Sequence, residues 1–368
     1  MLDIPAPLLT ALDEELSGVR APLKAQVRAL EELFAFFTRE RPGLRGRSYL
    51  DIPKYRCAYL RYHLPLNFAR ASCCLEHVRR LCPRIDSLPL VVDLGAGPGS
   101  ASLATLLSSS NCRRTYELYD RSRASLQIAR RLFDACGRHS VNVMERLERC
   151  TTRQFILPRL PRIEAPALVW VAMVLNELMA GRQAAGRIRE FAERLTTQVP
   201  EGSIVVMVEP ALRGPGRQLL RLHDELLELN SWRMLGPCTH QVQCPLLTIR
   251  GRPWCHFHFR WRAPRCAHEV AKPLGLTSNS SSLAFLAVER VASTDSNKAE
   301  AKGARQARVI GDVMSVRSGK SGIYLCEAGH RVLLTDPPRD CRRGDLLRAA
   351  GKDGYRLTIP WSAKRKGK

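Results

Sequence analysis

The sequence lacks any long apolar run. No stretch approaches the roughly 18 to 20 uninterrupted apolar residues that span a bilayer, which excludes a helical membrane protein. The first residues, Met1 to Pro5, also lack the basic start and apolar core of a secretory signal. We therefore expect a soluble intracellular protein with no membrane partner.

Acidic side chains are scarce relative to basic ones. Among 368 residues, 35 are Asp or Glu and 58 are Lys or Arg, so the formal net charge is +23. The excess is concentrated at 41–90, with 10 basic and 3 acidic residues, and at 340–368, with 9 basic and 3 acidic residues. Such a charge on a folded chain indicates a polyanionic partner, most often a nucleic acid. Four tyrosines of the first segment either contact an RNA backbone or pack an amphipathic helix: Tyr49, Tyr55, Tyr59 and Tyr62.

The pattern along the chain predicts an α/β protein. Residues 1–85 carry helical periodicity, and residues 86–290 alternate short β-branched runs with helix-like segments, as in a mostly parallel sheet. This core includes a Cys-rich insertion at 236–268. Residues 291–307 are small and polar and predict a linker, while residues 308–368 predict a small basic β-rich module. The strand patterns lie at 88–94, 116–119, 168–175, 204–208 and 284–288.

Seven of the thirteen cysteines show no metal-ligand spacing, and in a reducing compartment they are expected to be packing residues rather than disulfides. They are Cys57, Cys73, Cys74, Cys82, Cys112, Cys136 and Cys150.

Three further cysteines lie close together in the Cys-rich insertion. Cys238 and Cys244 are flanked by prolines, and Cys255 follows within Trp-Cys-His-Phe. Soft thiolates select zinc or an iron-sulfur cluster over hard cations, and the residues alone favour zinc. The candidates for a fourth ligand are His240, His256, His258, Cys266 and Cys326.

A glycine-rich loop follows the first predicted strand. Gly95, Gly97 and Gly99 come directly after the strand that carries Asp93, and a helix-like segment follows. Strand, glycine turn and helix in this order bring bare backbone against a ligand. A dinucleotide fingerprint requires glycine where Ser100 stands, and the Gly-Lys-Ser/Thr of a P-loop is absent.

This loop resembles motif I of the class I S-adenosylmethionine-dependent methyltransferases. The resemblance implies that the loop lies beneath the methionine part of the cofactor and that Asp120, with Glu117 in reserve, binds the ribose hydroxyls. Asn176 and Glu177 follow the fourth predicted strand and are the catalytic candidates, although the prolines and the aromatic residue of base N-methyltransferases are missing there. Asn176 alternatively caps a helix.

The whole pattern is similar to one family, the methyltransferase-like small-ribosomal-subunit assembly proteins of bacteria and mitochondria. The motifs that carry the likeness are the GAGPG loop, Asn176-Glu177-Leu178, Glu209-Pro210, Gly214-Pro215-Gly216, the Pro-Cys-x-His-x-x-x-Cys-Pro run, Trp254-Cys255-His256-Phe257 and Cys326 to Gly329. The resemblance implies a 4Fe-4S cluster, in place of zinc, on Cys238, Cys244, Cys255 and Cys326. Two departures are Thr239 where the family commonly has proline, and the segment 317–322 in place of a basic Lys-Arg-Gly-His segment.

We therefore expect an RNA-binding assembly factor of the small ribosomal subunit that holds S-adenosylmethionine and a structural 4Fe-4S cluster. Its partner would be small-subunit ribosomal RNA or a pre-ribosomal particle. The alternatives are an active rRNA methyltransferase and a zinc-stabilised RNA-binding scaffold without cofactor. A radical S-adenosylmethionine enzyme is disfavoured because no Cys-x-x-x-Cys-x-x-Cys run is present. No Arg/Ser-rich, acidic-poor leader is visible, which favours a bacterial cytoplasm over the mitochondrial matrix.

Overall fold

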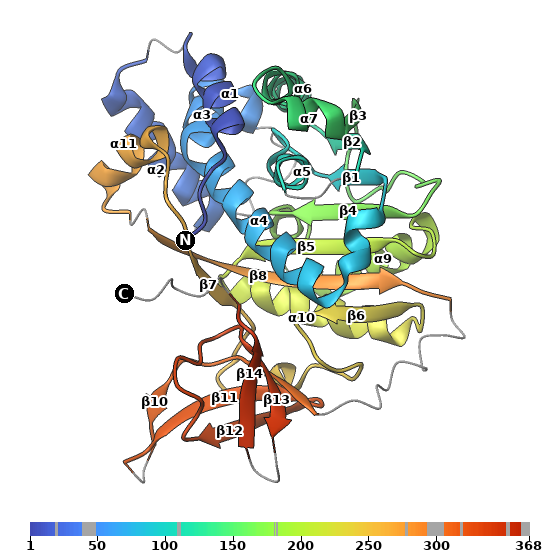
Figure 1. Ribbon diagram of the computed structural model, residues 1–368. Coiled ribbons are helices and arrows are strands. Elements are labelled where there is room, and N and C mark those ends of the chain that lie inside the picture. The colour runs from blue at the N-terminus through green and yellow to red at the C-terminus, as the bar shows by residue number, and fades with distance from the viewer. Residues whose placement is uncertain are drawn as a thin grey trace.

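The computed structural model of the chain consists of an α/β core, a set of N-terminal helices and a separate antiparallel C-terminal sheet (Figure 1). This confirms the predicted fold class. The described residues are 1–18, 21–38, 49–108, 112–179, 181, 183–276, 279–292, 305–316, 319–350 and 354–361. Within these ranges, no helix combines the length and the apolar character needed to cross a membrane.

The core sheet has the strand order β3-β2-β1-β4-β5-β8-β6, with β7 paired to β8. Strands β1 to β5 run parallel, whereas β8 is antiparallel to β5 and to β6. The bounds are β1 (Leu90–Leu94), β2 (Arg114–Asp120), β3 (Leu147–Gln154), β4 (Ala167–Ala172), β5 (Ile204–Pro210), β6 (Trp232–Gly236), β7 (Phe257–Arg260) and β8 (Ser280–Arg290). The order reverses between β1 and β4, and ligands of open α/β sheets bind beyond the carboxyl ends of the strands at such a point.

Helices cover both faces of this sheet (Figure 1). One face packs against the N-terminal helix α4 (Leu64–Leu81), with α5 (Ser100–Leu106), α6 (Arg123–Arg138) and α7 (Val141–Arg146) on the same side. The other face packs against α8 (Leu175–Leu178), α9 (Ala184–Gln198) and α10 (Arg213–Glu228). Successive side chains of each buried strand point to opposite faces of the sheet, so each strand contributes to the packing on both sides.

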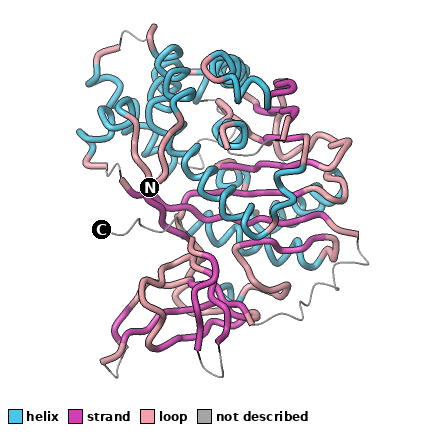
Figure 2. The backbone as a smooth tube through the Cα atoms, in the orientation of Figure 1, coloured by secondary structure: helices cyan, strands magenta, loops and turns pink. Residues whose placement is uncertain are grey.

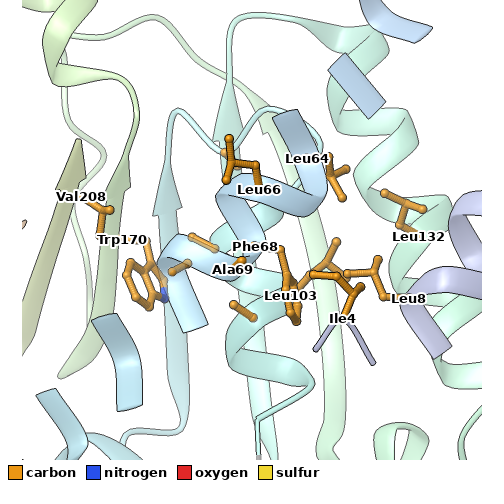
Figure 3. Close-up of a cluster of buried hydrophobic side chains, with 14 of the residues drawn as sticks. Ile4, Leu8, Leu64, Leu66, Phe68, Ala69, Leu103, Leu132, Trp170 and Val208 are labelled. Carbon is orange, nitrogen blue, oxygen red and sulfur yellow. The ribbon is translucent and has the colours of Figure 1, made fainter. Parts of the chain in front are cut away.

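The N-terminal helices are part of the core packing rather than an independent unit. Figure 3 shows Ile4 and Leu8 beside Leu103, and Phe68 and Ala69 of α4 lie between them and Trp170 of the sheet. The remaining elements of this region are α1 (Ala6–Leu16), α2 (Leu23–Thr38), η2 (Tyr49–Asp51), α3 (Pro53–Ala58), the π-helical turn η3 (Tyr59–His63) and η4 (Pro83–Ser87). The short helix α11 (Arg265–Ala271), with η6 (Lys272–Leu274) after it, joins α2 and η3 from much later in the chain.

The C-terminal sheet has a small core of its own, formed by Ala307, Val309, Ile323, Leu325, Cys341 and Leu347. Figure 2 shows it as a compact set of strands below the core. Its strands are β9 (Gln306–Val309), β10 (Met314–Ser315), β11 (Ser321–Glu327), β12 (His330–Thr335), β13 (Leu346–Ala350) and β14 (Gly354–Ile359). The linker expected at 291–307 falls mostly on residues 293–304, outside the described ranges, and β9 begins at Gln306.

Trp361 joins the C-terminal sheet to the core. Its indole packs against Phe257, Phe285 and His77, with ring centroids 4.7, 5.6 and 4.7 Å away. The indole N–H donates to the His258 carbonyl over 2.8 Å, and the Trp361 backbone N–H donates to the Asp345 carboxylate over 2.7 Å. One residue therefore contacts β7, β8 and α4 on one side and the C-terminal module on the other.

Candidate functional site

A cavity of about 340 Å³ opens at the carboxyl ends of β1, β2 and β4, where the strand order reverses. This volume is within the range of small-molecule sites. Of the residues predicted to bind a cofactor, Asp93, Gly95, Gly97 and Asp120 line the cavity. Gly99 does not line it.

All three loop glycines adopt the left-handed conformation, with φ of 79° at Gly95, 53° at Gly97 and 84° at Gly99. A Cβ at Gly95 would lie 2.8 Å from the Val174 side chain, so a larger residue is excluded there. At Gly97 the nearest atom to a Cβ would be 3.8 Å away, on Leu50. The backbone at Gly97 is therefore bare toward the cavity, whereas Gly99 lets α5 begin close to Leu118.

Asp120 is held beside this loop by backbone donors. The N–H of Gly97 donates to one carboxylate oxygen over 2.8 Å, and the N–H of Ser122 donates to the other over 2.8 Å. Burial raises the pKa of Asp120, and these two hydrogen bonds oppose that rise. The reserve candidate Glu117 instead accepts a 2.8 Å hydrogen bond from the hydroxyl of Tyr119 and is not part of the cavity lining.

Asp93 leaves one carboxylate oxygen without a partner. Its Oδ2 accepts from the Ser102 hydroxyl over 2.7 Å and from the Ser102 N–H over 3.2 Å, while Oδ1 is buried and has no hydrogen-bond partner among the described residues. The hydroxyl of Ser100, another lining residue, is buried and unpartnered in the same part of the chain. Asp93 and Ser100 thus both line the cavity, and each keeps one buried polar atom without a partner among the described residues.

The catalytic candidates Asn176 and Glu177 both line the cavity. The Asn176 side-chain amide donates to Glu209 over 2.6 Å and to the Met173 carbonyl over 3.1 Å. Asn176 lies inside α8 and Val174 is the N-cap, so the alternative that Asn176 caps a helix is wrong. Glu177 accepts from Arg121 over 3.2 Å. Glu209, which the sequence marks only as part of the Glu209-Pro210 motif, orients Asn176 from the end of β5.

An aromatic wall from the N-terminal helices closes the cavity, and the sequence did not predict it. It consists of Phe34, Phe37, Tyr49, Tyr59 and His63. Phe37 lies 5.0 Å from the His63 ring and 5.3 Å from the Tyr49 ring, between centroids. Burial lowers the pKa of His63 to about 3, so its imidazole is neutral. Since Tyr55, Tyr59 and Tyr62 are buried, the packing alternative holds for these three tyrosines.

The second candidate site is the group of Cys238, Cys244, Cys255 and Cys326, called the cysteine site below. The first three lie on loops around η5 (Pro245–Leu247) and before β7, and Cys326 comes from β11 of the C-terminal sheet. The pKa of Cys238 is raised by burial and by the charges of the other three thiols. Burial raises the pKa of Cys244 to about 11 and that of Cys326 to about 12. The fold therefore brings these four cysteines together, although the first and the last, Cys238 and Cys326, are 88 positions apart in the sequence.

No set of three His, Cys, Asp or Glu side chains in the described ranges is arranged to hold a metal ion. Among the other ligand candidates, only His240 contacts the cysteine site, with Nε2 3.3 Å from the Cys326 sulfur. His256 stacks on Trp254 at 4.9 Å, and His258 is exposed. Cys266 lies on α11 and contacts the Arg61 carbonyl among the N-terminal helices.

A buried arginine stands beside the cysteine site. Arg308 on β9 is 1% exposed and donates to the carbonyls of Pro237 and Gly344, both over 2.8 Å. Burial lowers its pKa to about 10, and the charges of Cys255, Cys238 and Cys326 oppose that change. The arrangement places one positive charge beside three of the four thiols, those of Cys238, Cys255 and Cys326.

Comparison with known proteins gives one family, described as the mitochondrial small ribosomal subunit Rsm22, which matches residues 53–353. No curated protein sequence matches the chain. Solved structures with a similar fold include the mitomycin 7-O-methyltransferase MmcR, at 16% identity over 78% of this chain and 74% of that chain, with a TM-score of 0.39. Precorrin-6y C5,15-methyltransferase from Geobacter metallireducens GS-15 is 11% identical over 59% and 87%, with a TM-score of 0.32. NSun6 from Pyrococcus horikoshii is 12% identical over 61% and 52%, with a TM-score of 0.35.

Proposed function

Since the chain belongs to the Rsm22 family, we propose that it is an RNA-binding assembly factor of the small ribosomal subunit that holds S-adenosylmethionine in the cavity and a 4Fe-4S cluster at the cysteine site. The family match over residues 53–353 carries the proposal, because that range includes the glycine loop and all four cysteines. The protein would act in the same compartment as the ribosome that it helps to assemble. This is the cytoplasm for a bacterial ribosome and the matrix for a mitochondrial ribosome.

The cavity fits S-adenosylmethionine by the chemistry of its lining. A cofactor with a positive sulfonium and an amino group requires negative or accepting groups at one end, and the orphaned Oδ1 of Asp93 and hydroxyl of Ser100 are such groups. A ribose requires a carboxylate with free lone pairs, and each oxygen of Asp120 accepts only one backbone hydrogen bond. When bound, the cofactor would supply an electrophilic methyl group.

We expect S-adenosylmethionine to bind about tenfold more tightly at pH 8 than at pH 6. Burial raises the pKa of Asp93 to about 7, the Ser102 hydrogen bonds oppose the rise and Asp120 adds to it. Below this pKa the carboxyl is neutral, and above it the side chain carries the negative charge that a cationic ligand favours. Calorimetric titration at both pH values measures the difference.

The Asp93→Asn variant serves as the control for that titration. Asparagine cannot ionise, so the affinity should be lower and independent of pH between 6 and 8. An unchanged pH dependence in the variant would show that another group is responsible. Absence of binding by the unaltered protein at either pH would favour the cofactor-free scaffold.

The cysteine site fits a cluster by its donor set. Four thiols with raised pKa values, two of them on buried and two on half-buried cysteines, are unfavourable as thiolates unless a metal centre compensates their charge, and Arg308 supplies part of that compensation. In the tautomer whose Nδ1 accepts from the Val242 N–H, the Nε2–H of His240 donates a hydrogen bond to the Cys326 sulfur, as groups outside the ligand shell commonly do at cluster ligands. With all four irons ligated, such a cluster would be structural. Zinc on the same thiolates is the alternative.

An active rRNA methyltransferase is the second candidate function. The observation in its favour is that Asn176 and Glu177 both line the cavity, with the Asn176 amide nitrogen fixed by Glu209. The Asn176 carbonyl oxygen could then accept a hydrogen bond from an amino group of a base. Incubation with labelled S-adenosylmethionine and small-subunit RNA tests this, with Asn176→Ala as the comparison. Incorporation that depends on Asn176 would favour the enzyme over the assembly factor without methyl transfer.

A further inference from the structure

Helix α10 carries three arginines at even spacing, of which Arg213 and Arg221 are exposed and Arg217 is half-buried. Arg213, Arg217 and Arg221 follow one another at four-residue intervals, about 6 Å apart along the helix axis. Arg250 and Arg252 lie on the neighbouring loop, and both are exposed. These five residues are called the arginine row below. They lie outside the two segments, 41–90 and 340–368, where the sequence concentrates its positive charge.

The row is a group of like charges held close together. Repulsion from Arg221, Arg252 and Arg213 adds to burial in lowering the pKa of Arg217. Within the described ranges, no ion pair joins any member of the row to an acidic side chain. Asp224, three residues after Arg221, is already engaged by His223 and by the N–H of Cys244. Like charges at four-residue spacing destabilise a helix.

Helix stability does not explain the row. Arg213 lies in the first turn of α10, where no acidic residue is present and where the helix dipole disfavours a cation. The fold nevertheless fixes this end of the row, because the Arg213 guanidinium lies 5.3 Å from the centre of the Trp254 ring. Trp254 in turn packs so closely on Gly216 that a Cβ there would come within 2.4 Å of the indole.

The neighbouring loop is fixed to the same helix. The Arg217 guanidinium donates to the carbonyls of Leu246, Leu247 and Pro253 at 3.0 to 3.2 Å. This ties the loop between Cys244 and Cys255 to α10 and sets Arg252 beside Arg217. Leu212, the residue before α10, lines the cavity, so the row begins one residue beyond the cavity lining.

We propose that the arginine row binds the phosphate backbone of ribosomal RNA and leads the strand past the cavity entrance. A regular row of positive charges matches a polymer with regularly spaced negative charges, as in a nucleic-acid backbone, better than it matches the irregular charges of an acidic protein. This inference rests on the proposed function, since it names the surface by which the factor binds its RNA.

The test compares two double variants of the full chain. Arg221→Ala with Arg252→Ala removes two exposed charges of the row and leaves Arg217 in place. Arg123→Ala with Arg130→Ala removes two exposed charges from α6, on the opposite side of the sheet. Binding to a small-subunit rRNA transcript is measured by fluorescence anisotropy over a series of KCl concentrations, and thermal unfolding is measured for each protein.

The row variant is expected to bind about tenfold or more weakly, and the slope of log affinity against log salt should fall by about 2. The control variant should keep the affinity and slope of the unaltered protein. The thermal midpoint of the row variant should be unchanged or higher, because repulsion is relieved.

Equal RNA binding by the row variant and the unaltered protein would overturn the proposed surface and leave the RNA-binding function standing. Retained RNA affinity with loss of binding to purified small subunits would identify an acidic protein as the partner and overturn the RNA assignment. No RNA binding by the unaltered protein would overturn the RNA-binding function and the surface together.

Discussion

Replacing Cys326 by serine is expected to remove the iron and sulfide from anaerobically purified protein, which should otherwise contain about four of each per chain. Cys326 is the one member of the cysteine site that comes from the C-terminal sheet, through β11. A serine hydroxyl is a poor ligand for iron, so one corner of the cluster would lose its attachment. Iron analysis, acid-labile sulfide analysis and the visible absorption spectrum measure the loss.

The matched control is Cys341→Ala. Cys341 is also buried in the C-terminal sheet, but it packs with Val309 and Leu347 and is not among the mutually interacting thiols of the cysteine site. This variant should retain iron and sulfide. Colourless unaltered protein with one zinc per chain would establish the zinc alternative. Unaltered protein without any metal would leave the four cysteines as packing residues.

Replacing Trp361 by alanine is expected to destabilise the attachment of the C-terminal sheet by about 3–5 kcal/mol, the range found when large buried aromatic residues are truncated. Trp361 is 3% exposed and packs between Phe257 and Phe285 of the core. On the other side, the Trp361 ring packs so closely on Gly344 that a Cβ there would lie 2.6 Å from it. Truncation to alanine would therefore leave a cavity between the core and the C-terminal sheet. Hydrogen exchange of the β9 and β13 amides measures the free energy of opening.

The Trp361→Phe variant separates packing from hydrogen bonding. Phenylalanine keeps most of the apolar contact but loses the indole N–H donated to the His258 carbonyl, so a cost of about 1–3 kcal/mol is expected. If the alanine variant opens within about 1 kcal/mol of the unaltered protein, Trp361 does not hold the two parts together. The connection would then rest on the cysteine site and on other contacts, such as the hydrogen bonds from Arg308 to the Pro237 carbonyl and from Arg80 to the Pro360 carbonyl.

The sequence predicts the buried strands well and the edge strands poorly. The strands β1, β4 and β5 are buried on both sides and read as continuous apolar runs, and β2 and β8 were also predicted. The sequence of β3, Leu-Glu-Arg-Cys-Thr-Thr-Arg-Gln, is largely polar because this strand forms the edge of the sheet. β7 lies within the Cys-rich insertion. Its alternation of buried and exposed residues is short, and the cysteines and histidines around it indicate metal ligands rather than a strand.

Only those parts of the cavity whose residues lie close together in the sequence could be predicted. The glycine loop and Asp120 lie in one strand-turn-helix-strand unit, so spacing indicates both. The aromatic wall comes from α2, η2 and η3, which reach the cavity through long-range packing that no local pattern reports. The sequence alone leaves RNA contact and packing open for the tyrosines there, and burial decides for packing at Tyr59.

The cysteine site could likewise be predicted from spacing only where its residues are close in the sequence. Cys238, Cys244 and Cys255 are close in sequence and were found by spacing, whereas Cys326 was selected by family resemblance from five candidates. Arg308 carries no motif, and only its burial among the thiols identifies it. Charge counted along the sequence also missed the arginine row, because α10 contains acidic residues further along that lower its net charge.

Crosslinking of the protein to RNA in living cells, followed by sequencing of the bound fragments, identifies the RNA that the protein contacts. A small-subunit assembly factor should strongly enrich small-subunit ribosomal RNA over large-subunit and messenger RNA, at a confined set of sites. Fragments spread over all RNA classes in proportion to their abundance, or no crosslinks at all, would contradict the assignment to small-subunit assembly.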